Sequence, residues 1–204
     1  MLDNAALRTA LDHLATLEPG FGRGLERVGY PEQRLRAPGY ETLLRTIVGQ
    51  QVSVASAAAI WRKLEAAVGP GAPAEALLAQ DVDGLRACGL SRQKQGYARS
   101  LAELTLSGEL DFGALPQDDE EAIAQLVRIK GIGRWSAEIY LLFAEGRPDV
   151  FPAGDLAVQI ELGRLLGLPD RPSEKTVRER GLAWSPWRGA AAIFAWHHYN
   201  TPVL

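Results

Sequence analysis

Two short stretches of the chain carry residues whose types and spacing could do chemistry. One is a tight turn, Gly131-Ile132-Gly133, between two apolar stretches, and the other is a lone carboxylate, Asp155, at the expected start of a helix. Gly131 can take the positive φ that ends a helix, and Gly133 leaves no side chain over the next one. The backbone amides from Gly131 to Arg134 then point outward at a positive helix end, where a phosphate oxygen binds well. Together, the glycine turn and Asp155 suggest a site that binds a nucleic-acid backbone and places one carboxylate beside it.

Each stretch also has an ordinary structural interpretation. A Gly-x-Gly sequence is common at a plain corner between helices. Asp155 is equally a good N-cap for a helix over 156–167, since aspartate is among the preferred capping residues. Both roles are compatible in one residue.

The longer pattern resembles the helix-hairpin-helix (HhH-GPD) superfamily of DNA glycosylases, in particular the alkylation-repair branch, DNA-3-methyladenine glycosylase II. The motif residues are Leu126, Ile129, Gly131, Ile132, Gly133, Trp135 and Ala137, followed by Phe151, Pro152 and Asp155. Further matching pieces lie in the family's order at 43–55, 89–94 and 184–188.

The elements that must position these residues are all predicted to be helical. Apolar residues recur at helical spacing over 43–48, 57–68 and 158–166, with Ser53, Ser173 and Ser185 as expected helix caps and Pro186 at a first helical position. No alternating strand pattern of useful length appears. The sequence therefore predicts an all-α fold. The resemblance implies two lobes, 39–148 and 1–38 plus 149–204, with a DNA-binding cleft between them.

The resemblance also implies the reaction. Asp155 falls on the family's catalytic position, where a carboxylate stabilises the positive charge that develops on deoxyribose as a base leaves, or orients the attacking water. Relatives that also cut the DNA backbone place a lysine where this chain has Trp135. An indole forms no Schiff base with the sugar. We therefore expect hydrolysis to an abasic site, without lyase activity.

Aromatic residues indicate which base leaves. A base must be flipped into a pocket before its glycosidic bond is accessible, and cationic alkylated purines stack well on electron-rich rings. By resemblance, Trp135, Trp196 and Tyr140 line this pocket. Two positions depart from well-known relatives, because Gln51 replaces a bulky leucine as the wedge that intercalates and Ile139 replaces an aromatic pocket residue.

The expected DNA-backbone contacts come from the hairpin residues Gly131, Ile132, Gly133 and Arg134. The family further implies a monovalent cation held against a phosphate by backbone carbonyls. In this chain those carbonyls belong to Val127, Ile129 and Ile132. No other metal site and no cofactor is expected, and the histidines have no arrangement typical of metal ligands.

Composition agrees with a soluble helical enzyme. The 204 residues are 47% hydrophobic, no stretch is long enough to span a membrane, and no signal-peptide pattern starts the chain. The single cysteine, Cys88, fits a reducing cytoplasm and excludes a four-cysteine iron–sulfur cluster. The net charge of −3 argues mildly against nucleic acid, although basic residues gather over 86–99 and 128–134.

Three functions remain open on these observations. The first is a monofunctional glycosylase for alkylated bases such as 3-methyladenine. The second uses the same chemistry on a deaminated or mismatched base. The third is a non-catalytic DNA-binding module, which would need neither Asp155 nor the pocket aromatics. In each, the partner is double-stranded DNA, damaged in the first two, and no obligate protein partner is evident.

Overall fold

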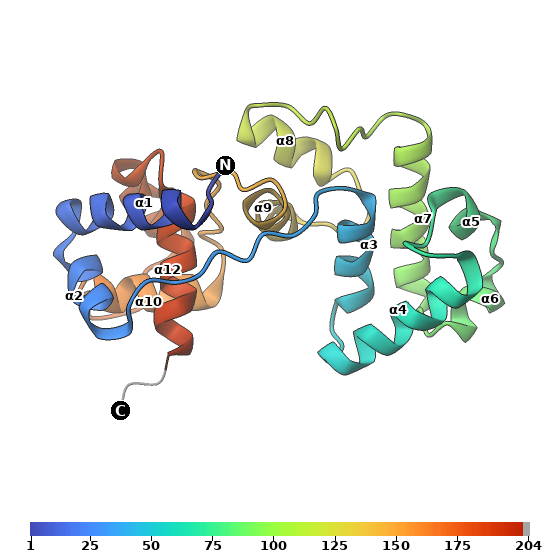
Figure 1. Ribbon diagram of the computed structural model, residues 1–204, viewed down its shortest axis with the longest axis horizontal. Coiled ribbons are helices and arrows are strands. Elements are labelled where there is room, and N and C mark those ends of the chain that lie inside the picture. Colours follow the sequence, from blue (N-terminus) through green and yellow to red (C-terminus); the bar gives the residue numbers. More distant parts are fainter. Residues whose placement is uncertain (202–204) are drawn as a thin grey trace. The chain divides into compact units, whose positions relative to one another are not determined.

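The computed structural model describes residues 1–201 and is helical throughout, so the predicted all-α class is confirmed. Figure 1 follows the chain from α1 to α12, with loops and short turns between the helices and no strand over the described range. None of these helices combines the length and apolar character that a membrane crossing requires.

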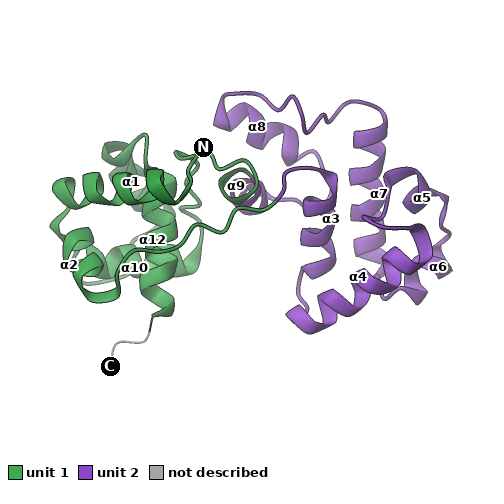
Figure 2. Ribbon diagram, viewed as in Figure 1, with its two compact units in different colours: residues 1–36, 141–204 green, residues 37–140 purple. Residues whose placement is uncertain are grey.

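The described chain divides into two compact units, coloured separately in Figure 2. One unit joins both ends of the chain, residues 1–36 and 141–204, and the other comprises residues 37–140. The helix α9 (Arg134–Phe143) contributes residues to both.

The unit formed by the chain ends is built around an alanine-rich helix. Its helices are α1 (Asn4–Leu17), α2 (Pro19–Val28), α10 (Leu156–Leu165), α11 (Glu174–Gly181), the short 3-10 helix η1 (Leu182–Trp184) and α12 (Arg188–Asn200). Residues 189–195 of α12 are all buried. Around them pack Leu11, Phe21, Leu162 and Trp184, with the Phe21 and Trp184 rings meeting edge-on at 5.5 Å. The small side chains of α12 allow this close approach of several helices.

The middle unit carries the hairpin. Its helices are α3 (Tyr40–Gly49), α4 (Val54–Val68), α5 (Ala74–Ala79), α6 (Val82–Ala87), α7 (Arg92–Leu106) and α8 (Asp119–Leu126). The predicted apolar stripe of α3 is buried, and Ser53 caps α4 by accepting from the Ser56 N–H at 3.1 Å. Local patterning therefore determines these helices.

One predicted helix start is wrong. We expected Ser185 to cap the last helix with Pro186 at its first position, whereas α12 begins at Arg188 with Trp187 as its N-cap. The reason is that the Ser185 hydroxyl donates to the Asp149 carboxylate at 2.8 Å instead of accepting a helix N–H. Ser173 does cap α11, as predicted, through the Thr176 N–H.

Candidate active site in the unit of the chain ends and candidate DNA-binding hairpin

The loop before α10 holds Asp155 through several backbone contacts. The Asp155 N–H donates to the Pro152 carbonyl at 3.0 Å. Farther back in the loop, Arg178 donates to the Phe151 carbonyl at 3.2 Å, and the buried Gln159 amide donates to the Ala153 carbonyl at 2.9 Å. Long side chains from α10 and α11 thus satisfy the carbonyls of a segment that has no helical partner.

The Asp155 side chain is half-buried and is held by two donors. Its Oδ1 accepts the Val158 backbone N–H at 3.0 Å, which is the N-cap geometry expected for α10. The same oxygen accepts the indole N–H of Trp196 at 3.1 Å, from α12. Capping and a long-range contact together fix the carboxylate at the positive end of a helix.

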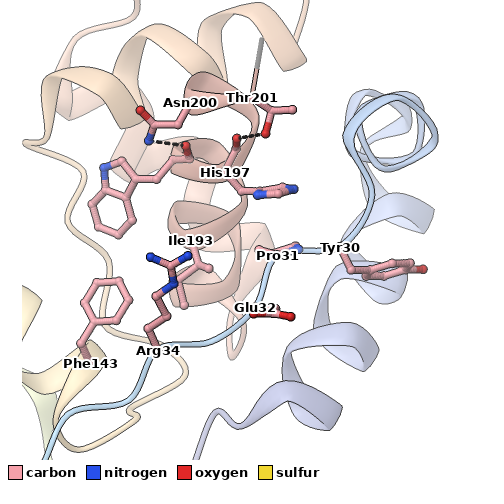
Figure 3. Close-up of a pocket in the computed structure, with 10 residues that line it drawn as sticks. Tyr30, Pro31, Glu32, Arg34, Phe143, Ile193, His197, Asn200 and Thr201 are labelled. Carbon is pink, nitrogen blue, oxygen red and sulfur yellow. Dashed lines mark hydrogen bonds between the residues drawn. The ribbon is translucent and has the colours of Figure 1, made fainter. Parts of the chain in front are cut away.

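Trp196 also lines a cavity in this unit. The cavity has a volume of about 650 Å³, within the range of small-molecule pockets. Figure 3 shows its two walls, one from the segment that holds Tyr30, Glu32 and Arg34 and the other from α12. Phe143 lies at its edge with its ring 5.8 Å from that of Trp196. Trp196 therefore both lines the aromatic cavity and donates a hydrogen bond to the Asp155 carboxylate.

The hairpin between α8 and α9 uses its two glycines differently. Gly131 has a φ of +83°, and a Cβ there would lie 2.2 Å from the Tyr97 ring, so only glycine fits. A Cβ at Gly133 would meet nothing within 4 Å. Ile132 between them is buried, and its N–H donates to the Ile129 carbonyl at 3.0 Å. Packing requires the first glycine, whereas the second leaves the surface open.

The backbone of this hairpin presents donors for an anion. Over the described residues, the N–H groups of Gly131, Gly133 and Arg134 donate to no protein acceptor. The Arg134 side chain, in contrast, is already engaged, because it pairs with Glu120 and with the buried Glu138 at 2.9 Å. Hydrogen bonding to Glu120, reinforced by the charge of Glu138, raises the pKa of the Arg134 guanidinium. Any phosphate contact by Arg134 would thus rely on its backbone N–H.

The residue predicted as a wedge lies in a turn tied to this hairpin. Gln51 is exposed and takes a φ of +55°, which is uncommon for a residue with a side chain. Next to it, the Gln50 amide donates to the Gly131 carbonyl at 2.9 Å. Lys94 donates to the Val48 carbonyl at 2.8 Å, and burial lowers the pKa of this amine. Two side-chain contacts therefore anchor the end of α3 directly before Gln51.

The other two predicted pocket residues lie in the middle unit. Trp135, in the first turn of α9, is 48% exposed. Tyr140 is buried, with its ring 5.8 Å from Phe112 and its hydroxyl accepting the Gly39 N–H at 2.7 Å. These contacts give Tyr140 a structural role at the start of α3. Ile139, beside it, is partly buried.

The carbonyls expected to hold a monovalent cation remain compatible with one. The Ile129 carbonyl accepts a single backbone hydrogen bond, and a carbonyl oxygen has two lone pairs. Val127 is 40% exposed at the end of α8. Among the described residues no cluster of three or more His, Cys, Asp or Glu side chains could hold a metal ion.

Two features of the site were not predicted from the sequence. One is the hydrogen bond from Trp196 to Asp155, which joins residues 41 positions apart. The other is the anchor from Gln50 to Gly131, across 81 positions. The only local signal for the second was a polar residue, Gln50, directly after the buried apolar residues Ile47 and Val48 of α3.

The chain is similar to known proteins over most of its length. The family described as "HhH-GPD superfamily base excision DNA repair protein" matches residues 44–186. DNA-3-methyladenine glycosylase 1 of Schizosaccharomyces pombe is 33% identical over 97% of this chain and 92% of its own length.

Two solved structures are similar over nearly the whole chain. The S. pombe 3-methyladenine DNA glycosylase, in complex with abasic DNA, has 34% identity and a TM-score of 0.76 over 92% of this chain and 95% of its own. The DNA-3-methyladenine glycosidase of Bacillus halodurans has 30% identity and a TM-score of 0.87 over 94% of this chain and 89% of its own.

Proposed function

Because the chain belongs to the HhH-GPD superfamily of base excision DNA repair proteins, we propose that it is a monofunctional DNA glycosylase that removes alkylated bases such as 3-methyladenine from damaged duplex DNA. Support comes from the S. pombe 3-methyladenine DNA glycosylase, which matches nearly the full chain at 33–34% identity. The expected product is an abasic site.

The observation that carries this proposal is the fixed carboxylate of Asp155. Breaking the glycosidic bond develops positive charge on the sugar, and an anion near that charge lowers the barrier. At an effective dielectric constant of about 20, opposite charges about 4 Å apart attract by roughly 4 kcal/mol, or about three decades in rate. Since Val158 and Trp196 already hold Oδ1, the carboxylate needs little reorganisation when charge develops.

A cationic alkylated purine suits the aromatic surroundings of Asp155. Trp196 and Phe143 present neighbouring rings at the cavity, whose lining also carries one carboxylate, Glu32, and one guanidinium, Arg34. Stacking of a cation on such rings contributes about 0.5–2 kcal/mol. A neutral, undamaged base lacks this gain, which favours alkylated substrates over normal ones. Trp135, exposed on α9, is a further aromatic residue that we assign to base binding.

In this proposal, the hairpin binds the DNA backbone. The outward amides of Gly131, Gly133 and Arg134 bind a phosphate, and a monovalent cation at the carbonyls of Val127, Ile129 and Ile132 would add a positive charge beside it. Gln51, exposed at its anchored turn, fills the gap left by the flipped base. Its amide can hydrogen-bond to the orphan base, which the leucine of other relatives cannot do.

We further propose that the enzyme hydrolyses the glycosidic bond to the base, without cutting the DNA backbone and without a cofactor. Trp135, two positions after Gly133, has no amine for a Schiff base. With one cysteine in the sequence, Cys88, the chain lacks the thiolates for a four-cysteine cluster. Borohydride added during the reaction is expected to trap no covalent protein–DNA adduct on a denaturing gel. A stable adduct would mean that another residue acts as a nucleophile.

The decisive test of function is release of methylated purines from alkylated DNA by wild type and by Asp155→Asn. Asparagine caps a helix about as well as aspartate but carries no charge. The variant is therefore expected to keep its thermal stability and to lose about three decades in the rate of 3-methyladenine release.

The matched control is Asp118→Asn, which changes the same residue type at another N-cap. Asp118 caps α8 through the Glu121 N–H at 2.9 Å, so capping is perturbed equally while excision should be unchanged. Excision by Asp155→Asn at the wild-type rate would remove Asp155 from the mechanism. If wild type binds duplex DNA but releases no methylated purine, a panel of deaminated and mismatched bases decides whether another lesion is the substrate.

A further inference from the structure

A groove in the unit of the chain ends lies where α2 meets α10. Gly20, Arg23, Gly24 and Arg27 follow one another at helical spacing, so they share one face of α2. A Cβ at Gly20 would lie 1.7 Å from the Leu165 carbonyl oxygen, so the two backbones touch. The close approach draws the neighbouring arginines to the edge of a cavity of about 420 Å³.

Positive charge in this groove exceeds negative charge. Arg23, Arg27 and Arg164 all line it, and Glu161 is the acidic residue among its lining. That carboxylate is already occupied, because one oxygen pairs with Arg164 at 3.0 Å and the other contacts His198.

The two arginines of α2 have no acidic partner. Neither Arg23 nor Arg27 forms an ion pair with any residue in the described part of the chain. In contrast, Arg134, Arg147, Arg178 and Arg188 are all paired with carboxylates. Two uncompensated positive charges beside a concave surface attract an anion.

We propose that this groove is a phosphate-binding site separate from the hairpin. Guanidinium groups match phosphate oxygens in a bidentate geometry, and two of them one helical turn apart suit adjacent phosphate groups or one polyphosphate. The buried Glu161 and His198 form its floor and orient Arg164. The phosphates belong either to a nucleic-acid backbone, in which case the site rests on the function proposed above, or to a small polyphosphorylated ligand.

The test uses the full chain and a double variant, Arg23→Gln with Arg27→Gln. Both side chains are exposed, so the fold should be retained, as checked by thermal unfolding. The control, Arg62→Gln with Arg171→Gln, removes the same charge from two exposed arginines outside the groove. Two probes are measured for each protein: inorganic tripolyphosphate by calorimetry, and a duplex with an abasic-site analogue over a range of salt concentrations.

Two results support the site, and each identifies its ligand. For a nucleic-acid backbone, the slope of log K against log salt falls in magnitude by about 1.8 in the groove variant, since each phosphate contact contributes about 0.9. For a small polyphosphate, tripolyphosphate binding weakens at least about tenfold, while the salt slope for duplex DNA stays as in wild type.

The proposal is overturned if the groove variant matches the control with both probes. Failure of the proposed function is recognised separately. In that case wild type neither binds the duplex nor releases methylated bases, and the tripolyphosphate titration alone decides whether the groove is an anion site.

Discussion

At the scale of single residues, Asp155 is the N-cap of α10, and its contacts also fit the catalytic role that we propose for it. Each carboxylate oxygen has two lone pairs, so Oδ1 can accept both the Val158 N–H and the Trp196 indole N–H. The cap then serves the proposed chemistry, because it orients the charge. The same argument explains why asparagine is the informative replacement, since it keeps the cap and removes only the charge.

A second carboxylate, Asp149, makes a pH-dependent contribution to stability. It accepts hydrogen bonds from the Arg188 side chain at 2.8 and 2.9 Å, from the Arg188 N–H at 3.2 Å and from Ser185. Burial alone raises the pKa of Asp149, but the hydrogen bonds from Arg188 and Ser185 outweigh burial and hold the pKa below its ordinary value. The ionised form is therefore favoured by folding.

Asp149→Asn is expected to lower the free energy of unfolding by about 1.5–3 kcal/mol at neutral pH. Because the folded pKa is depressed, this contribution is complete above the ordinary carboxyl pKa of about 4 and is lost as the pH falls through the folded value. Urea unfolding of both proteins at about pH 7 and about pH 3 checks it. An equal difference at both pH values would assign the stabilisation to uncharged contacts.

At the scale of elements, the two glycines of the hairpin have different roles: Gly131 is required for packing, and Gly133 is proposed to allow DNA binding. Gly131→Ala places a side chain at positive φ and against Tyr97, which together should destabilise the protein by about 2–5 kcal/mol. Gly133→Ala meets open space and should cost about 1 kcal/mol or less, as expected for alanine in place of glycine just before a helix. Its effect should appear in DNA binding instead.

Thermal unfolding and duplex binding of the two glycine variants check this separation. Because phosphate contacts carry no base information, Gly133→Ala should weaken binding to unrelated sequences equally. Binding at the wild-type level, or a loss limited to one sequence, would contradict a backbone contact at Gly133.

The elements themselves were predictable where the signal is local. The stripe of α3 and the caps Ser53 and Ser173 were predicted correctly, since a cap contacts an amide three residues away. Ser185 failed as a predicted cap because Asp149, 36 positions away, takes its hydroxyl. A competing partner of that kind leaves no trace in the local pattern.

At the scale of the whole molecule, charge placement matters more than total charge. The chain is acidic overall, with a net charge of −3, yet several of its carboxylates are used inside ion pairs with arginine. Arg134 is one example, because its side chain, which the sequence predicted to contact DNA, pairs with Glu120 and Glu138 instead. Arg23 and Arg27 illustrate the reverse, because within residues 1–201 no carboxylate pairs with either of them.

The sequence by itself determined the helical class, the glycine turn and the cap at Asp155. These depend on apolar periodicity and on residues within a few positions, which the order of amino acids states directly. Only the tertiary structure decided that Trp196 holds Asp155, that Gln50 anchors the hairpin and that two arginines of α2 face a groove. Such contacts join distant segments, and they form only where the sizes of packed side chains bring the helices close enough.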